Sequence, residues 1–473
     1  MRNTDRGSGN RPDPVLYSRL KRLAAPLFKA LFRFQPRIDP ALWAYQGPAV
    51  VAANHCTFMD PVLVALSLPQ PVSFVGMKAL TRFKPLQPFF NHMGLIPKQQ
   101  FTLDLPALKA MLRLLRQGGW LGVFPEAQRS LDGSALPFDS SLIHLARRSH
   151  AAIITVRISG AYMAWPRWQR GGFHPGQIEA EARLLLTPQQ LQQWPVEVCQ
   201  AQLVRELAVS FAAWQRHQTI PVRYRQLWPN RHLSDLLEQC PRCHRHAAMR
   251  ASGRDGLTCR FCHYRVRLRT DGLLYQVPAP ARQQQRQTSG AARPFSDLEQ
   301  WHQWQIAQWR QQLLAARLPV TPAPPAAAGK QAVSGRGSPL KVWPVKVKAL
   351  ESEADRNRKQ PWLACSGAWQ RGLLAAFPDG LRFSPQEHQV GLRSRQPKPL
   401  FFPLSAANAH LVCRTGLELR LQAGTGPLWR CRPRRRQAVI QLVDFAAAFS
   451  PGPVPPAPSE AVAVLKPPPV APG

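Results

Sequence analysis

Short apolar runs alternate with helical periodicity between residues 41 and 225. The runs have the length of buried strands, and a helical repeat of apolar residues over 105–115 ends at Gly118-Gly119. We predict strands over 48–53, 72–77, 120–124 and 153–158. Because strands and helices alternate along the chain, the fold class is α/β, with a mixed sheet covered by helices.

Residues 1–40 precede this domain and carry a different pattern. Leucines recur at three- and four-residue spacing from Leu16 to Leu31, and basic residues occupy much of the remaining surface. The pattern predicts a basic amphipathic helix that is kinked or restarted at Pro26. Such a helix either lies in a membrane interface or packs on the next domain with a solvated basic face. The pattern leaves both alternatives open.

Further segments follow the α/β domain. Residues 236–278 hold paired cysteines, 290–318 have helical character, and 319–344 have the Ala, Pro and Gly content of a linker. Residues 345–450 contain short β-like stretches and end in an apolar run, 438–449, that would close the module as a helix. This module faintly resembles a pleckstrin-homology-like lipid-binding barrel. The proline-rich tail, 451–473, is expected to be disordered.

The whole chain of 473 residues is strongly basic. Its 62 Lys and Arg residues outnumber 26 Asp and Glu residues, which gives a net charge of +36 and favours a polyanion as partner. No apolar run reaches the roughly eighteen residues of a membrane-spanning helix, and the first residues lack the apolar core of a signal peptide. The cysteine spacing suits a reducing compartment. We therefore expect a cytoplasmic protein that is peripheral to the membrane.

Candidate chemistry begins directly after the first predicted strand, in the sequence Asn-His-Cys-Thr-Phe-Met-Asp at 54–60. Across a strand-to-helix turn, Asp60 can accept a hydrogen bond from one ring nitrogen of His55 and leave the other free to take a proton. In the alternative interpretation, Asp60 caps a helix that has Pro61 at its first position. Cys56 is not expected to be a nucleophile, because a neighbour on a strand end points away.

A second polar loop follows the strand at 120–124 and reads Phe-Pro-Glu-Ala-Gln-Arg-Ser over 124–130. Ligands of open α/β sheets gather outside the carboxyl ends of the strands. Arg129 could pair with a phosphate there, and Glu126 could orient Arg129 or a substrate hydroxyl. Taken alone, the loop could equally be a surface turn with a Glu–Arg ion pair.

Together the two loops resemble the lysophosphatidic acid acyltransferase (glycerolipid acyltransferase) family over residues 41–190. The first loop matches the family's His-x4-Asp block, and the second matches Phe-Pro-Glu-Gly-x-Arg-Ser except at Ala127. Three further stretches are similar to the lysine-bearing strand, the second block and the apolar fourth block of the family: 74–80, 93–97 and 152–158.

The resemblance implies a glycerolipid-acyltransferase-like fold and direct acyl transfer. His55, held by Asp60, would act as general base while the acceptor hydroxyl attacks the thioester of acyl-CoA or of an acyl carrier protein. The acceptor would be a lysophosphatidic acid-like glycerophospholipid, bound by Glu126, Arg129, Lys98 and Gly94.

Four departures from the family pattern bear on acceptor recognition. Ala127 replaces a glycine, Gln100 falls near the place of an arginine with Lys98 two residues earlier, and Thr155 replaces a proline. The segment 139–141, Asp-Ser-Ser, stands where a basic turn with glycine is common. The His–Asp pair itself is intact.

The third constellation is a pair of Cys-x-x-Cys knuckles at Cys240, Cys243, Cys259 and Cys262. Four thiolates suit a structural Zn²⁺ in a closed tetrahedral site, so the segment is predicted to be a zinc ribbon and no catalytic metal is expected. Arginines surround the knuckles. The ribbon could bind nucleic acid, face lipid headgroups or serve as a spacer.

The main hypothesis is an acyltransferase whose partners are an anionic membrane surface, a lysophospholipid acceptor and an acyl donor. A lysophospholipid-remodelling enzyme is the variant within the same class. The alternative from another class is a nucleic-acid-binding zinc-ribbon protein with an inactive α/β domain. That alternative accounts for the charge and the ribbon, but it leaves the co-occurrence of the two strand-end loops unexplained.

Overall fold

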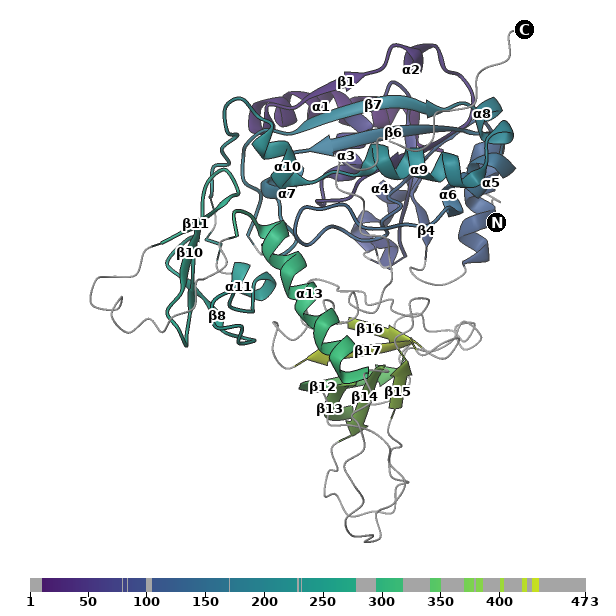
Figure 1. The fold of residues 1–473 in the computed structure, drawn as a ribbon. Helices are drawn as coiled ribbons and strands as arrows, with labels where there is room; N and C mark the ends of the chain where they lie inside the picture. The colour runs from purple at the N-terminus through teal and green to yellow at the C-terminus, as the bar shows by residue number, and fades with distance from the viewer. Residues whose placement is uncertain are drawn as a thin grey trace.

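The computed structural model describes residues 11–78, 80–82, 84–98, 104–169, 171–227, 229–230, 232–277 and 295–317, and six strands between 341 and 433. An α/β domain comes first, built on a seven-stranded sheet of order β1-β7-β6-β2-β5-β3-β4 (Figure 1). Its strands are β1 (Gln35–Ile38), β2 (Ala49–Ala53), β3 (Val72–Met77), β4 (Ile96–Lys98), β5 (Trp120–Val123), β6 (Ala152–Ser159) and β7 (Glu179–Leu186).

All neighbouring strands in this sheet are parallel except β6 and β7. The mixed sheet and the four predicted strands are therefore confirmed. The sequence did not predict β1, β4 and β7. β1 and β4 are short edge strands, and β7 alternates half-buried charged residues with buried alanines, so none of the three forms an apolar run.

Helices cover both faces of the sheet (Figure 1). Alternate residues of β2 point to opposite sides, so that Val50 and Ala52 join one buried cluster while Ala49, Val51 and Ala53 join the other. The helices of the α/β domain are α1 (Pro14–Phe32), α2 (Ala41–Ala44), α3 (Asp60–Leu66), α4 (Gln87–His92), α5 (Leu105–Arg116), α6 (Ser141–Arg148), α7 (Ala161–Ala164), α8 (Pro188–Gln193), α9 (Val196–Leu207) and α10 (Phe211–Arg216), with 3-10 turns η1 (Leu80–Arg82) and η2 (Lys84–Leu86).

The amphipathic helix predicted near the N-terminus is α1, which continues through Pro26 without a restart. Asp13 caps its first turn, and Arg33 ends it in the left-handed conformation. Tyr17 and Phe32 are buried against the domain, whereas Leu23 and Leu27 are 72% and 54% exposed. One side of the helix therefore packs on the domain, while the other carries exposed leucines, and the membrane use stays a prediction.

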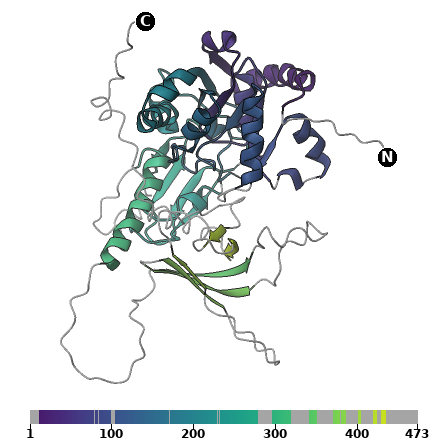
Figure 2. The same ribbon diagram turned by 90° about the vertical axis from the view of Figure 1, so that its right-hand side faces the viewer.

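The cysteine-rich segment forms a small antiparallel sheet of order β11-β10-β9-β8, preceded by α11 (Leu233–Leu236). A long helix, α13 (Leu298–Arg317), follows it and lies beside the small sheet in both ribbon views (Figures 1 and 2). Residues of the ribbon and of α13 belong to the same buried cluster as one face of the large sheet. The strands are β8 (Met249–Ser252), β9 (Gly256–Cys259), β10 (Arg265–Leu268) and β11 (Leu274–Gln276).

The C-terminal region contains a six-stranded antiparallel sheet of order β15-β14-β13-β12-β17-β16. The β-rich character is confirmed, but β12 begins inside the range predicted as linker. The closing helix predicted over 438–449 and the tail 451–473 lie outside the described residues. The strands are β12 (Lys341–Ala349), β13 (Gln370–Phe377), β14 (Gly380–Pro385), β15 (Leu400–Pro403), β16 (Leu419–Gln422) and β17 (Leu428–Pro433).

Candidate active site

The two candidate loops leave the sheet at the same edge, because β2 and β5 are adjacent and parallel. Two backbone groups join them. The Ser130 N–H donates to the His55 carbonyl at 2.8 Å, and the His55 N–H donates to Glu126 Oε1 at 3.0 Å. The loops after residues 53 and 123 therefore lie side by side at this edge of the sheet.

His55 and Asp60 form a direct pair, with 2.7 Å between Nδ1 and Oδ2. The same Oδ2 accepts the backbone N–H groups of Cys56 and Thr57, and Oδ1 accepts the Thr57 hydroxyl. Because the carboxylate oxygens accept, Nδ1 carries the ring proton and Nε2 keeps its lone pair. Asp60 is fully buried while the His55 side chain is 20% exposed, which leaves the imidazole accessible to a substrate.

Asp60 is not a conventional helix cap. It is the first residue of α3, and Met59 occupies the cap position without a side-chain hydrogen bond. The carboxylate folds back onto residues 55–57 instead, and the Met59 N–H donates to Thr57 Oγ1 at 3.0 Å. The geometry therefore favours the interpretation of Asp60 as the group that orients His55.

Asn54 and Phe124 complete the support of the imidazole, and the sequence did not single out either residue for this role. The buried Asn54 amide exchanges two hydrogen bonds with the backbone of Ile158 in β6, at 2.9 and 2.8 Å. The Phe124 ring stacks on His55 with 4.2 Å between centroids and 19° between planes. Phe74 in turn stacks on Phe124. The loop is thus fixed to a neighbouring strand while the ring is held in its plane.

Glu126 links the two loops through its carboxylate. It is only 6% exposed, and its two oxygens accept the backbone N–H groups of His55 and Leu136, each at 3.0 Å. Burial raises the pKa of Glu126 to about 8. Both oxygens are engaged with the backbone, which argues against the predicted contact with substrate and for a positioning role.

Arg129 lies beside the first loop. Its guanidinium carbon is 3.5 Å from the centroid of the Phe58 ring, and Phe58 is 56% exposed. The Arg167 side chain donates to the Arg129 carbonyl at 2.7 Å and so fixes the backbone at this point. A cation is therefore held on the same surface as the imidazole.

Lys98 and Gly94 lie farther from this centre. Lys98 ends β4, which is three strand spacings from β2, about 14 Å. Gly94 is buried in the turn before β4 with a φ of 66°, a conformation that glycine adopts without strain. The structure thus brings His55, Asp60, Glu126 and Arg129 together, whereas Lys98 and Gly94 could meet only the far end of an extended ligand.

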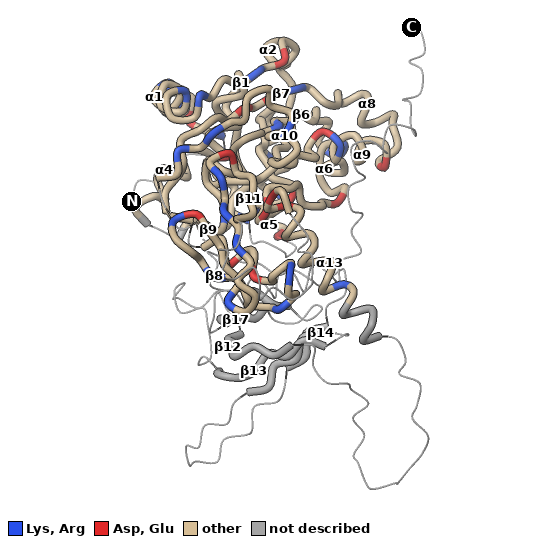
Figure 3. Tube along the Cα trace, turned by 60° about the vertical axis from the view of Figure 1, so that its left-hand side comes forward, with Lys and Arg blue, Asp and Glu red and all other residues tan. Residues whose placement is uncertain are grey.

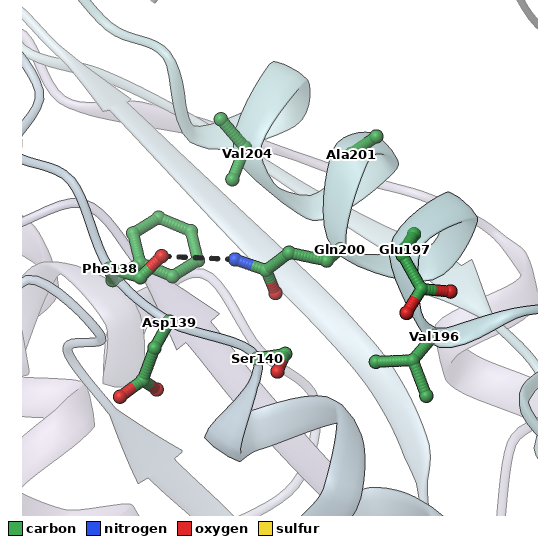
Figure 4. Close-up of a pocket in the computed structure, with 8 residues that line it drawn as sticks. All are labelled: Phe138, Asp139, Ser140, Val196, Glu197, Gln200, Ala201 and Val204. Carbon is green, nitrogen blue, oxygen red and sulfur yellow. Dashed lines mark hydrogen bonds between the residues drawn. The ribbon is translucent and has the colours of Figure 1, made fainter. Parts of the chain in front are cut away.

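A separate hollow of about 400 Å³ lies between the segment before α6 and the helix α9 (Figure 4). The Gln200 amide crosses it and donates to the Phe138 carbonyl at 3.1 Å. Two carboxylates, those of Asp139 and Glu197, line it. It shares no residue with the His55 surface, and acidic walls do not suit a phosphate-bearing ligand.

Comparison with known proteins finds matches to the segment that carries these loops. A family model described as Acyltransferase matches residues 33–159, which contain both loops. Residues 33–159 are thus similar to the acyltransferase family. The chain is 26% identical over 152 residues to a 1-acyl-sn-glycerol-3-phosphate acyltransferase of Limnanthes douglasii. This alignment covers 32% of this chain and 53% of that protein. The chain is 25% identical over 133 residues to a chloroplastic enzyme of that name from Arabidopsis thaliana, which covers 28% of this chain and 37% of that protein.

The chain spans about half or less of the length of these curated relatives. Among solved structures, the crystal structure of the 1-acyl-sn-glycerophosphate (LPA) acyltransferase PlsC from Thermotoga maritima matches with a TM-score of 0.35 and 19% identity. That match covers 41% of this chain and 77% of the other. No helix within the described part of the chain is both long and apolar enough to cross a membrane.

Cys56 is buried beside His55 but is poorly suited to act as a nucleophile. Burial, reinforced by the charges of Asp60 and Glu126, raises the pKa of the Cys56 thiol well above its usual value. The Asn54 amide donates to its sulfur at 3.6 Å and lowers the pKa, but burial outweighs this effect. The raised pKa supports the expectation that Cys56 is not the nucleophile.

The four cysteines of the knuckles converge as predicted, and their sulfurs all lie within 4.8 Å of one another. Cys240 Sγ is 3.5 Å from Cys262 Sγ, and Cys243 Sγ is 3.7 Å from Cys259 Sγ. Tetrahedral Zn–S bonds of about 2.3 Å place sulfurs about 3.8 Å apart, so the cluster fits Zn²⁺.

The backbone of the two knuckles repeats the same turn. His244 and His263 each follow the second cysteine of their knuckle in the left-handed conformation, with φ of 55° and 57°. The N–H groups of Arg242 and Phe261 each point at the sulfur of the first cysteine, at 3.4 Å. Donors aimed at the sulfurs stabilise thiolates and support the choice of cysteines, rather than the nearby histidines, as ligands.

Proposed function

We propose that this protein transfers a fatty acyl group from a thioester donor, acyl-CoA or an acyl carrier protein, to the free hydroxyl of a lysophosphatidic acid-like glycerophospholipid. The observation that carries the proposal is the His55–Asp60 pair at 2.7 Å on the surface that also holds Arg129. The acyltransferase family of this domain and the names of its relatives support the same class of reaction.

The chemistry follows from the state of the imidazole. Nε2 of His55 has no hydrogen-bond partner among the described residues, so it can take the proton of the acceptor hydroxyl as that oxygen attacks the thioester carbonyl. The tetrahedral intermediate then collapses, the C–S bond breaks, and the proton on Nε2 passes to the departing thiolate. The products are an ester and a free thiol, and Asp60 holds Nδ1–H throughout.

Arg129 would hold the acceptor phosphate, because a guanidinium binds phosphate oxygens in a paired arrangement. Glu126 would set the position of the loop rather than touch the acceptor. Lys98 would reach only the distal part of an extended substrate.

The direct test is an acyl-transfer assay of purified full-length protein with several lysophospholipids and both kinds of thioester donor. We expect transfer by the wild type and a fall of about 10²–10⁴-fold in kcat for His55→Ala. Transfer that survives this substitution would remove His55 as the base. If no acceptor is acylated, the alternative of an inactive α/β domain in a nucleic-acid-binding protein gains, and DNA and RNA binding would be measured next.

An anionic membrane surface is the proposed location of the reaction. Val15, Leu23 and Leu27 of α1 are exposed beside basic residues of the same helix, and Leu86 and Phe89 are exposed at α4. The Asp13 N–H donates to the His92 carbonyl, which joins the start of α1 to the end of α4. Exposed apolar side chains together with cations suit an anionic lipid interface.

Vesicle binding tests this location. We expect co-sedimentation with phosphatidylglycerol vesicles to exceed that with phosphatidylcholine vesicles, and the double variant Leu23→Ser, Leu27→Ser to lose most of it. Ile220, which is 80% exposed outside these helices, provides the matched control Ile220→Ser. Equal loss in the control would refute this surface.

We also propose that Cys240, Cys243, Cys259 and Cys262 hold a structural Zn²⁺. Metal analysis of the purified protein should give about one zinc per chain, and Cys259→Ser should lower this content.

Blue positions in Figure 3 follow the ribbon strands, so the ribbon adds a basic surface to the molecule.

A further inference from the structure

We infer that α13 braces the active-site loop against the zinc ribbon, and that His302 on α13 is a positioning residue for the segment carrying Arg129. The inference deepens the proposed function and rests on it for the effect on catalysis. Its structural part can be tested independently of acyl transfer.

The contact centres on Asp132, three residues after Arg129 and only 4% exposed. Asp132 Oδ1 accepts hydrogen bonds from within its own loop: from the Ser134 N–H at 3.0 Å, the Ser134 hydroxyl at 2.6 Å and the Ser130 hydroxyl at 3.4 Å. Asp132 Oδ2 accepts from α13 instead, from His302 Nδ1 at 2.8 Å and Gln303 Nε2 at 3.0 Å. One buried carboxylate thus ties the active-site loop to a helix that lies 170 residues later.

The pair is electrostatically matched. Burial alone would raise the pKa of Asp132, but the hydrogen bond and charge of His302, together with the two hydrogen bonds from Ser134, outweigh burial and lower it. His302 is itself buried, with its side chain 5% exposed. A buried carboxylate that lost these donors would be left poorly compensated, so the loop would have to move toward water or toward another donor.

An adjoining face of α13 is fixed by the segment that enters the first knuckle. Trp301 Nε1 donates to the Gln239 carbonyl at 3.0 Å, and Gln305 Nε2 donates to the Leu236 carbonyl at 3.0 Å. The Gln239 N–H donates back to Gln305 Oε1 at 2.9 Å. Gln239 directly precedes Cys240, so the register of α13 against this segment depends on the fold of the knuckle.

Aromatic contacts strengthen the same attachment. His244, at the end of the first knuckle, packs edge-on against Trp304, and Tyr264, just after the second knuckle, packs edge-on against Trp301. His302 lies between these two tryptophans in the sequence, on a helix whose ribbon side and loop side are both buried. A helix is stiff over one turn, so a ribbon that holds Trp301 and Gln305 also sets the position of His302.

The functional consequence concerns the second loop more than the first. Arg129 and Ser130 precede Asp132 directly, whereas His55 keeps its own carboxylate partner in Asp60. Loss of the His302 contact should therefore impair acceptor binding while it leaves most of the general-base chemistry in place. The kinetic signature is a higher KM for the acceptor with little change in kcat.

The experiment uses full-length, zinc-loaded protein and three variants. His302→Ala removes the donor, and His302→Asn restores it, because the asparagine amide lies near the place of Nδ1. Gln311→Ala is the matched control, since Gln311 is exposed on the same helix. We expect the acceptor KM to rise about 10- to 100-fold in His302→Ala, to recover in His302→Asn and to stay unchanged in Gln311→Ala.

Amide hydrogen exchange gives the readout that does not depend on activity. In the wild type the N–H groups of Ser130 and Leu136 are bonded to the His55 carbonyl and to Glu126. They should exchange faster in His302→Ala than in the wild type or His302→Asn. Should His302→Ala fail to fold, Gln303→Ala, which removes the exposed second donor to the same oxygen, should show the same changes in smaller size.

Cys259→Ser tests the ribbon end of the brace. This variant should lose zinc and show the same faster amide exchange in residues 126–136. In the double variant His302→Ala, Cys259→Ser, exchange in this loop should be no faster than in His302→Ala alone. Unchanged loop exchange in His302→Ala, or in a folded zinc-free Cys259→Ser protein, would overturn the inference. If the wild type acylates no acceptor while the exchange pattern follows our expectation, the proposed function fails and the brace stands.

Discussion

The two loops at the carboxyl edge of the sheet differ in where their key supporting contacts come from. In the first loop, residues 54–60, the carboxylate that orients the proposed base belongs to the loop itself, because Asp60 binds His55, Cys56 and Thr57. The second loop, residues 124–134, has hydrogen bonds of its own around Asp132, but it also depends on distant partners, which include Tyr162, Phe211 and His302. The proposed base is thus oriented by a residue of its own loop, whereas the proposed acceptor site depends on several elements distant in the sequence.

The largest effect that tests this comparison is expected from removing the Asp60 carboxylate. Asp60→Asn should lower kcat by about 10²–10⁴-fold. The asparagine amide can turn an N–H group toward His55 Nδ1 and the Cys56 N–H, which both need an acceptor, and it then no longer fixes the tautomer of His55. Acyl transfer at saturating acceptor and donor measures the effect.

Thr57→Val is the matched control for this prediction. It removes the hydroxyl that donates to Asp60 Oδ1 but leaves the contact between Asp60 and His55. It should cost about 1–3 kcal/mol of stability and less than about tenfold in kcat. A wild-type kcat in Asp60→Asn, or an equal loss in both variants, would mean that Asp60 acts only through stability.

The second way is to test the link between the loops at Glu126. In Glu126→Gln one of the two backbone donors, from His55 or Leu136, would face an amide N–H, which should cost about 1–3 kcal/mol. The variant should also lose a pH dependence. Burial raises the folded-state pKa of Glu126 to about 8, above its ordinary value, so the folded protein binds the proton more tightly than the unfolded chain.

The sign follows from that difference. Protonated Glu126 contributes stability at low pH, and this contribution is lost as the pH rises from about 4.5 to about 8. Melting temperatures measured from pH 5 to pH 8.5 should fall more steeply for the wild type than for Glu126→Gln, with the smallest gap at the alkaline end. Parallel curves would show that the backbone N–H donors keep Glu126 ionised throughout.

The contrast between the loops also explains what the sequence could predict. The His–Asp pair, the four main strands and the cysteine knuckles are each encoded within short windows, so spacing and periodicity reveal them. The contact between Asp132 and His302 has no such signature. Neither residue belongs to a motif, and their approach depends on how the ribbon places α13 against the acyltransferase domain.

Glu126 shows a different limit. The sequence placed it correctly at the strand end, but the choice between substrate contact and backbone support depends on which N–H groups the fold brings to its oxygens. One of these donors, Leu136, lies ten residues along the loop. Local pattern therefore identified the position of Glu126, whereas its role depends on contacts that the local pattern does not encode.

The smallest expected effect concerns Ala127, where the family usually has glycine. Its φ of 57° lies in the left-handed region, which costs a residue with a Cβ roughly 1–2 kcal/mol, whereas glycine adopts it freely at an entropic cost of about 0.5–1 kcal/mol in the unfolded chain. Ala127→Gly should therefore stabilise the protein by about 0.5–1 kcal/mol in chemical denaturation. Ala135 lies in the same segment outside the left-handed region, and Ala135→Gly should destabilise instead. If both substitutions destabilise alike, Ala127 is not strained, and the second loop is held so firmly by its distant partners that its own backbone preference has no influence.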